Sequence, residues 1–156
     1  MAYCEYDSPI GTLTLVASAA GLRAVWWPGD LRATVAGERE PDQVLRQAVG
    51  ELDEYFAGRR RTFDIPLDPV GTDFQLAAWR ILRGIPYGHT ISYGEQARRL
   101  GDPRKARAVG AANGRNPLSI VVPCHRVVGS TGTLTGFAGG VDTKRWLLDF
   151  ERAHAA

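Results

Sequence analysis

The chain has 156 residues, of which 44% are hydrophobic and 23% charged, with a formal net charge of +2. This length allows one domain, or a small domain joined to a medium one, with a proper core. No apolar run approaches the ~20 residues that cross a bilayer, and the N-terminus has neither the basic start nor the apolar segment of a signal peptide. We therefore expect a cytoplasmic protein without a membrane partner.

Residues 1–70 have the pattern of a small α/β unit without chemistry of its own. Alternating apolar and polar residues over 4–27, with turn residues at 8–11 and 20–21, predict a β-meander. The apolar spacing over 41–58 predicts a helix capped by Gly58. Residues 61–68 predict one more short strand. The turn residues at 68–71 predict a linker, which places the domains at 1–70 and 71–156.

Residues 71–156 predict a mostly helical domain. A capping-box pattern at 72–75 opens a helix that ends near Gly84. A second such pattern at 92–95 opens a short helix that stops at 100–101, and Asp102-Pro103 begins a third over 103–114. Two short helices joined by about three residues predict a helix-turn-helix, whose second helix normally meets DNA.

Basic residues concentrate in this half. Between His89 and Ser130 seven basic residues stand against two acidic ones, a local charge of +5. Such a segment suits a polyanion, usually nucleic acid; the alternative is a solvated helix face rich in arginine.

The third predicted helix has one long side chain, Arg107, among small ones. Its exposed face is predicted to consist of Ala106, Ala108, Gly110, Ala111 and Ala112. Small residues let a backbone approach closely, which fits a narrow minor groove with one arginine available to enter the base stack. The alternative is an alanine-rich helix packed in a core.

Residues 119–128, SIVVPCHRVV, begin as a buried strand and then place Cys124 beside His125. Free cysteine often serves only as a small buried hydrophobe. Neighbouring side chains on a strand point to opposite faces, so direct contact between the two is not guaranteed, and a bridging water would connect them. Cys4 lies far away and no disulfide is expected. The cysteines and histidines show no zinc spacing, and no metal is expected.

Four stretches, 71–95, 106–117, 120–140 and 144–151, resemble the O6-alkylguanine-DNA alkyltransferases, also called methylated-DNA–protein-cysteine methyltransferases. The PCHR sequence with Asn116-Pro117 upstream and Lys144 and Glu151 downstream is very specific. The N-terminal half is similar only through SPIGTLTL and YFAG. The resemblance implies an α+β fold: a ribonuclease H-like N-terminal α/β unit and a mostly helical C-terminal domain with a winged-helix-like helix-turn-helix.

The resemblance also implies a reaction. The alkyl group of O6-methylguanine, and of O4-methylthymine, in double-stranded DNA would pass to Cys124 once per molecule, after base flipping and without a cofactor. A thiol with an ordinary pKa near 8.5 is mostly protonated, so the transfer needs a base. We expect a monomer; clustering along DNA stays open.

The implied catalytic residues are Cys124 as acceptor, His125 as its base through water, Glu151 orienting the imidazole, Asn116 bracing the loop, Tyr93 donating to the leaving purine, and Lys144 favouring that donation. The implied DNA-binding residues are Arg107, Ala106, Ala108, Gly110 and Tyr93. The implied pocket residues are Val127, Leu134, Phe137, Ala138, Asn113 and Ser119. Phe137 stands where tyrosine is commoner. Without the resemblance, Tyr93 is interpreted as a packing aromatic and Glu151 as a solvated carboxylate.

Two other classes are weighed. A lesion-binding relative would lack the cysteine, and the intact PCHR argues against it. A Cys-His hydrolase would need an oxyanion hole and no DNA-binding helix, and residues 106–117 argue against it.

Overall fold

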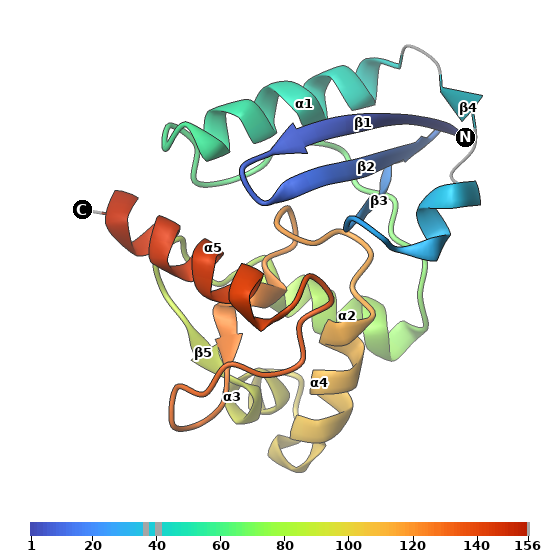
Figure 1. The fold of residues 1–156 in the computed structure, drawn as a ribbon. Helices are drawn as coiled ribbons and strands as arrows, with labels where there is room; N and C mark the ends of the chain where they lie inside the picture. Colours follow the sequence, from blue (N-terminus) through green and yellow to red (C-terminus); the bar gives the residue numbers. More distant parts are fainter. Residues whose placement is uncertain (36–37, 40–41, 156) are drawn as a thin grey trace. The chain divides into compact units, whose positions relative to one another are not determined.

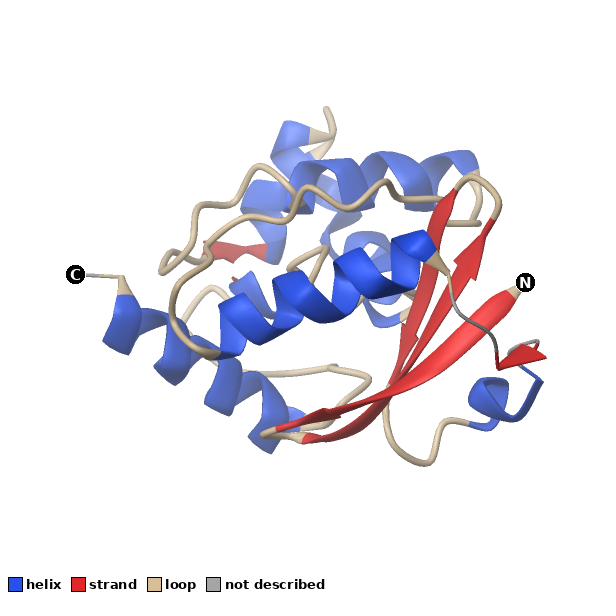
Figure 2. Cartoon of the chain, turned by 90° about the horizontal axis from the view of Figure 1, so that it is seen from above, coloured by secondary structure: helices blue, strands red, loops and turns tan. Residues whose placement is uncertain are grey.

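The computed structural model describes residues 1–35, 38–39 and 42–155, and the chain divides into two compact units, Met1–Val70 and Gly71–Ala156 (Figure 1). The fold is α+β, as expected: a sheet with one long helix comes first, and a mostly helical unit follows (Figure 2). Within the described ranges no helix is long and apolar enough to cross a membrane.

The N-terminal sheet has the strand order β3-β2-β1-β4. Strands β1 (Ala2–Ser8), β2 (Gly11–Ser18) and β3 (Gly21–Trp26) form the predicted antiparallel meander, and β4 (Glu38–Arg39) pairs parallel with β1. A short 3₁₀ helix, η1, spans Leu31–Val35. Hydrophobic residues of β2 are completely buried, which makes this strand the centre of the unit's core.

Helix α1 (Gln43–Phe56) packs against the three meander strands. The Asp42 side chain accepts a hydrogen bond from Leu45 N at 3.1 Å and so caps its start. Gly58, with a φ of 76°, follows its end. The predicted helix is therefore confirmed, including the glycine that stops it.

The strand predicted at 61–68 is wrong. A single parallel bridge joins Leu67 to Leu22 at the outer edge of β3. Two backbone hydrogen bonds hold it, Leu22 N to Pro66 O and Asp68 N to Leu22 O, both 2.8 Å. Pro66 has no N–H to donate, so the pairing does not extend into a ladder.

The C-terminal unit contains the predicted helix-turn-helix. Helix α2 (Asp73–Leu82) starts with both hydrogen bonds of the capping box at Thr72. Helix α3 (Tyr93–Arg99) follows strand β5 (Ile91–Ser92), and a 3₁₀ turn, η2 (Pro103–Lys105), leads into α4 (Ala106–Gly114). The unit continues with η3 (Cys124–Arg126), β6 (Val127–Val128), which pairs parallel with β5, and α5 (Val141–His154).

Buried amides fix the two helices of the motif to each other. Gln96 on α3 and Asn113 on α4 exchange two side-chain hydrogen bonds, 3.0 and 2.8 Å long. Trp79 on α2 donates from Nε1 to Ala112 O at 2.8 Å. Ala112 is 3% exposed, so its predicted place on the exposed face of α4 is wrong. Fully satisfied buried networks of this kind rigidify the elements that they join.

The strand predicted ahead of Cys124 is also wrong, because residues 119–121 form a turn and Val122 a bend. Ile120 has a φ of 75° and is the only non-glycine residue with a positive φ in the part of the chain that the structure describes. A β-branched residue rarely adopts this conformation, which is strained.

Candidate active site

Asn116 holds the turn that precedes Cys124. Its Nδ2 donates to Val122 O at 2.9 Å, and its Oδ1 accepts from Leu118 N at 3.0 Å. One buried side chain thus ties the two ends of the segment that contains the strained Ile120. A side-chain amide can do this because it both donates and accepts.

Cys124 opens the 3₁₀ turn η3 and is 5% exposed. Burial raises the pKa of its thiol; hydrogen bonds with Asn116 and Ser119 and the charge of Lys144 act in the opposite direction. The resting group is therefore a thiol, surrounded by groups that favour its thiolate once a base removes the proton.

His125, Arg126 and Glu151 form a buried cluster beside Cys124. His125 Nε2 lies 2.8 Å from Glu151 Oε2. Arg126 donates from Nε to Glu151 Oε1 at 2.8 Å and from Nη2 to Oε2 at 2.9 Å. Burial lowers the pKa of His125, whereas the pKa of Glu151 lies well below its ordinary value because electrostatic attraction and hydrogen bonds from His125 and Arg126 together outweigh burial. An ionised carboxylate can only accept hydrogen bonds. The ring hydrogen of a neutral His125 is therefore on Nε2, which donates to Glu151.

The other ring nitrogen of this histidine is then an acceptor. His125 Nδ1 is buried and forms no hydrogen bond with any described residue. A lone pair in that position is suited to accept a proton from a neighbouring group, either directly or through one water.

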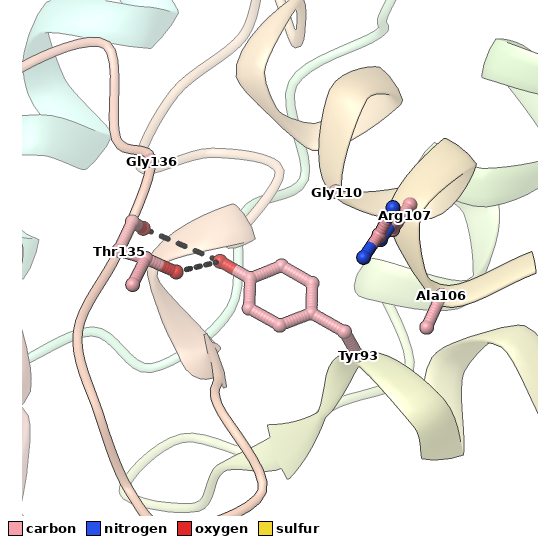
Figure 3. Close-up of a pocket in the computed structure, with 6 residues that line it drawn as sticks. All are labelled: Tyr93, Ala106, Arg107, Gly110, Thr135 and Gly136. Carbon is pink, nitrogen blue, oxygen red and sulfur yellow. Dashed lines mark hydrogen bonds between the residues drawn. The ribbon is translucent and has the colours of Figure 1, made fainter.

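A second cluster joins Tyr93, Lys144 and Thr135; Figure 3 shows the Tyr93 and Thr135 side of it. The Lys144 side chain is 1% exposed and donates from Nζ to Tyr93 Oη at 3.3 Å and to Thr135 O at 3.1 Å. Tyr93 Oη also donates to Thr135 O at 3.3 Å. A buried ammonium group thus lies against a phenol oxygen.

Beside this cluster lies a cavity of about 380 Å³, lined by Tyr93, Ala106, Arg107, Gly110, Thr135 and Gly136 (Figure 3). Its walls come from α3, α4 and the loop 129–140. Arg107 is exposed and makes no salt bridge with a described residue. Ala108 is exposed on the same helix.

The remaining residues expected in the pocket occupy different places. Val127 and Ser119 are buried near Cys124 in the chain, and Phe137 and Ala138 lie in the loop 129–140. Asn113 is engaged by Gln96, and Leu134 lines a separate cavity of about 280 Å³ together with residues of α5.

Sequence reasoning missed three participants. Arg126 stands next to the predicted histidine, and a charged residue inside an apolar stretch was the available indication. The backbone carbonyl of Thr135 accepts a hydrogen bond from Lys144, and Gly136 lines the cavity. Every residue type has a carbonyl, so sequence alone gives no indication of that contact.

A helix-turn-helix that shares one unit with a buried cysteine and its histidine defines a protein class that combines nucleic-acid binding with cysteine chemistry. The family model described as "6-O-methylguanine DNA methyltransferase, DNA binding domain" matches residues 73–153, and the one described as "6-O-methylguanine DNA methyltransferase, ribonuclease-like domain" matches residues 1–69. The chain belongs to the 6-O-methylguanine DNA methyltransferase family.

Similar proteins extend over the whole chain. A methylated-DNA–protein-cysteine methyltransferase of Methanosarcina acetivorans is 45% identical over 153 residues, covering 97% of this chain and 98% of the relative. One from Mycolicibacterium paratuberculosis is 49% identical, covering 98% and 93%. The crystal structure of Mycobacterium tuberculosis O6-methylguanine methyltransferase aligns with a TM-score of 0.91 at 46% identity, covering 99% of this chain and 94% of that chain. The crystal structure of M. tuberculosis OGT in complex with DNA aligns with a TM-score of 0.90 at 45% identity and has the same two coverages.

Proposed function

We propose that this protein repairs DNA by transferring the alkyl group of O6-methylguanine, and of O4-methylthymine, to Cys124. The observation that carries the proposal is the pairing of His125 Nε2 with an ionised Glu151, which leaves Nδ1 as a base next to the only cysteine of the C-terminal unit. The names of the relatives, and a DNA complex of one similar structure, support DNA as the substrate.

Binding is assigned to the helix-turn-helix. The small residues of α4 let its backbone enter a minor groove, and Arg107 takes the place of the extruded nucleotide in the base stack. A base whose O6 is to react has to leave the duplex. The cavity between Tyr93, Arg107 and Gly136 lies beside Tyr93, past which the extruded base would pass on its way to Cys124.

The chemistry begins with deprotonation of Cys124. Its proton passes through a bridging water to His125 Nδ1, and Glu151 stabilises the imidazolium that forms. The thiolate attacks the methyl carbon, so that a C–S bond forms, the C–O6 bond breaks, and the electron pair stays on guanine. Tyr93 donates a proton to the departing base, and the nearby Lys144 charge favours that donation.

The proton that His125 took from Cys124 returns through solvent to Tyr93, so the net result is that the methyl group replaces the thiol proton and guanine gains one proton. The thioether has no path back to a thiol, so each molecule acts once. The methyl group comes from DNA, and the reaction needs no cofactor. Phe137 stacks on the base, with Val127 and Ala138 contacting its edge. The proposed form is a monomer, and the proposed location is the cytoplasm.

Mass spectrometry tests the proposal. After incubation with a duplex containing O6-methylguanine, the peptide that holds Cys124 gains one methyl mass, at no more than one per molecule. Cys4 is the internal control, and Cys124→Ala is the matched variant without an acceptor. Repeated transfers by one molecule, or methylation of Cys4, would contradict the proposal.

A further inference from the structure

Arg126 is bound on several sides inside the C-terminal unit. It is 5% exposed, and besides its two hydrogen bonds to Glu151 it donates from Nη1 to Ile85 O at 2.8 Å. The Tyr87 ring centroid lies 5.6 Å from its Cζ. A guanidinium held in this way does not reach a DNA phosphate, although Arg126 counts among the basic residues of the segment.

The arrangement fixes the charge of the cluster. Glu151 Oε2 accepts from Arg126 Nη2 at 2.9 Å and lies 2.8 Å from His125 Nε2, so one carboxylate serves both. The charges of Arg126 and Glu151 cancel, and His125 is left neutral. Lys144 on α5 is the other cation whose field reaches His125, and like Arg126 it disfavours a proton on the imidazole.

Removing the guanidinium would change this balance. Glu151 is 1% exposed, and a buried carboxylate that loses its counter-charge draws a proton onto the adjoining imidazole. Protonated imidazole carries a hydrogen on both ring nitrogens. His125 Nδ1 could then no longer accept the proton of Cys124.

We propose that Arg126 is a positioning residue that holds Glu151 in a bidentate ion pair and thereby keeps His125 neutral, with Nδ1 available as the base. This inference rests on the proposed function, because it concerns the base that activates Cys124. It assigns to Arg126 no contact with DNA or with the transferred group.

The pH dependence of single-turnover methyl transfer tests the inference. In Arg126→Gln the acid limb of the rate profile moves up by one pH unit or more, so on that limb transfer is at least about 10-fold slower than in the wild type at the same pH, since one pKa unit is a factor of ten in protonation. Arg126→Lys keeps the positive charge but loses the bidentate guanidinium geometry. We expect its acid limb to stay within half a pH unit (roughly threefold in protonation) of the wild type. A loss in Arg126→Gln that is equal at every pH would overturn the inference.

A double variant separates charge from packing. In Arg126→Gln/Glu151→Gln neither charge remains, and such neutral replacements of buried ion pairs often fold well. Its acid limb returns toward that of the wild type, even though each substitution removes a native contact. If the double variant keeps the shifted limb of Arg126→Gln, charge balance is not what Arg126 supplies.

NMR of ¹⁵N-histidine-labelled protein gives a readout independent of activity, since the chain has three histidines. In the wild type, His125 stays neutral and Nε2-protonated at pH 7, with a pKa below the ordinary ~6.5; a charged His125 at pH 7 would overturn the inference without any variant. Wild-type protein that shows this tautomer but transfers no methyl group would instead contradict the proposed function.

Discussion

Lys144 is the residue whose burial most needs an explanation. The residue is 1% exposed, and the two hydrogen bonds that the structure gives its ammonium group go to Tyr93 Oη and Thr135 O, neither of which is a carboxylate. A buried charge is costly unless it is hydrogen-bonded, and pairing with a carboxylate is the usual compensation. A cation in this position instead acts on the phenol oxygen, which agrees with the proposed proton donation by Tyr93.

Tyr93→Phe tests that role. We expect methyl transfer to slow by about 10²-fold, the typical contribution of a general acid, because the ring and its packing remain while the donated proton is lost. The measurement is the single-turnover rate on a lesion duplex, with thermal unfolding as a check of the fold. Tyr3→Phe, in β1, is the control and keeps the wild-type rate. An unchanged rate in Tyr93→Phe removes Tyr93 from the mechanism.

At the scale of the element, the helix-turn-helix holds most of its arginines in local ion pairs. Glu95 pairs with Arg98 at 2.6 Å and with Arg99 at 3.2 Å, and Asp102 pairs with Arg104 at 3.0 Å. Lys105, Arg107 and Arg115 make no salt bridge with a described residue. Of these three, Arg107 is the one that lines the cavity beside Tyr93.

Arg107→Ala is therefore expected to slow repair of duplex DNA at least about 10-fold, and to leave attack on the free base O6-methylguanine nearly unchanged. The reason is that filling the base stack matters only when a nucleotide has to be extruded. Arg98→Ala removes an equal charge that is already paired, and it serves as the matched control with a smaller effect on duplex. Equal losses on duplex and free base would show that Arg107 does not serve extrusion.

A glycine in the N-terminal unit sets the approach of β3 to the segment 66–68. Gly21 has a φ of 155°, and a Cβ there would lie 2.5 Å from Pro66 O. Gly21→Ala is expected to lower the free energy of unfolding by about 3 kcal/mol, through strain and a backbone clash. Gly50→Ala, on an exposed helical position with no atom within 4 Å, is the control and raises stability by roughly 0.5 kcal/mol. Urea denaturation measures both; a neutral Gly21→Ala would contradict the expected clash.

The sequence predicted those elements whose ends are defined by residues within the element itself. Helices α1, α2 and α3 carry their own caps, so local residues define their starts. Residues 61–68 and 119–122 have strand-like apolar patterns, but their backbones are set by Pro66 and by the Asn116 hydrogen bonds, which no periodicity reveals. The active site could be predicted from the side chains of the PCHR sequence. The contact of the Thr135 carbonyl with Lys144 could not, because every residue has a backbone carbonyl.

For the molecule as a whole, the structure suggests that affinity and reactivity reside in different groups of the C-terminal unit. Three exposed cations that make no salt bridge with a described residue, Lys105, Arg107 and Arg115, lie on η2, on α4 and just after it, whereas Cys124, His125 and Glu151 are buried. The phosphate contacts of three such cations release counterions, which predicts that log K falls with log salt at a slope of roughly −3. The reacting thiol contributes nothing to that slope.

Cys124→Ser tests this separation. A hydroxyl nearly matches the thiol in size but is far harder to ionise, so methyl transfer is lost while affinity for a lesion duplex persists. Fluorescence anisotropy at several salt concentrations, on wild type and Cys124→Ser, gives both affinity and slope. Arg115→Ala in the Cys124→Ser background makes the slope of log K against log salt shallower by about one, because one phosphate contact is removed. A serine variant that loses DNA binding would make Cys124 a structural residue, and an affinity that ignores salt would make the basic segment a solvated helix surface.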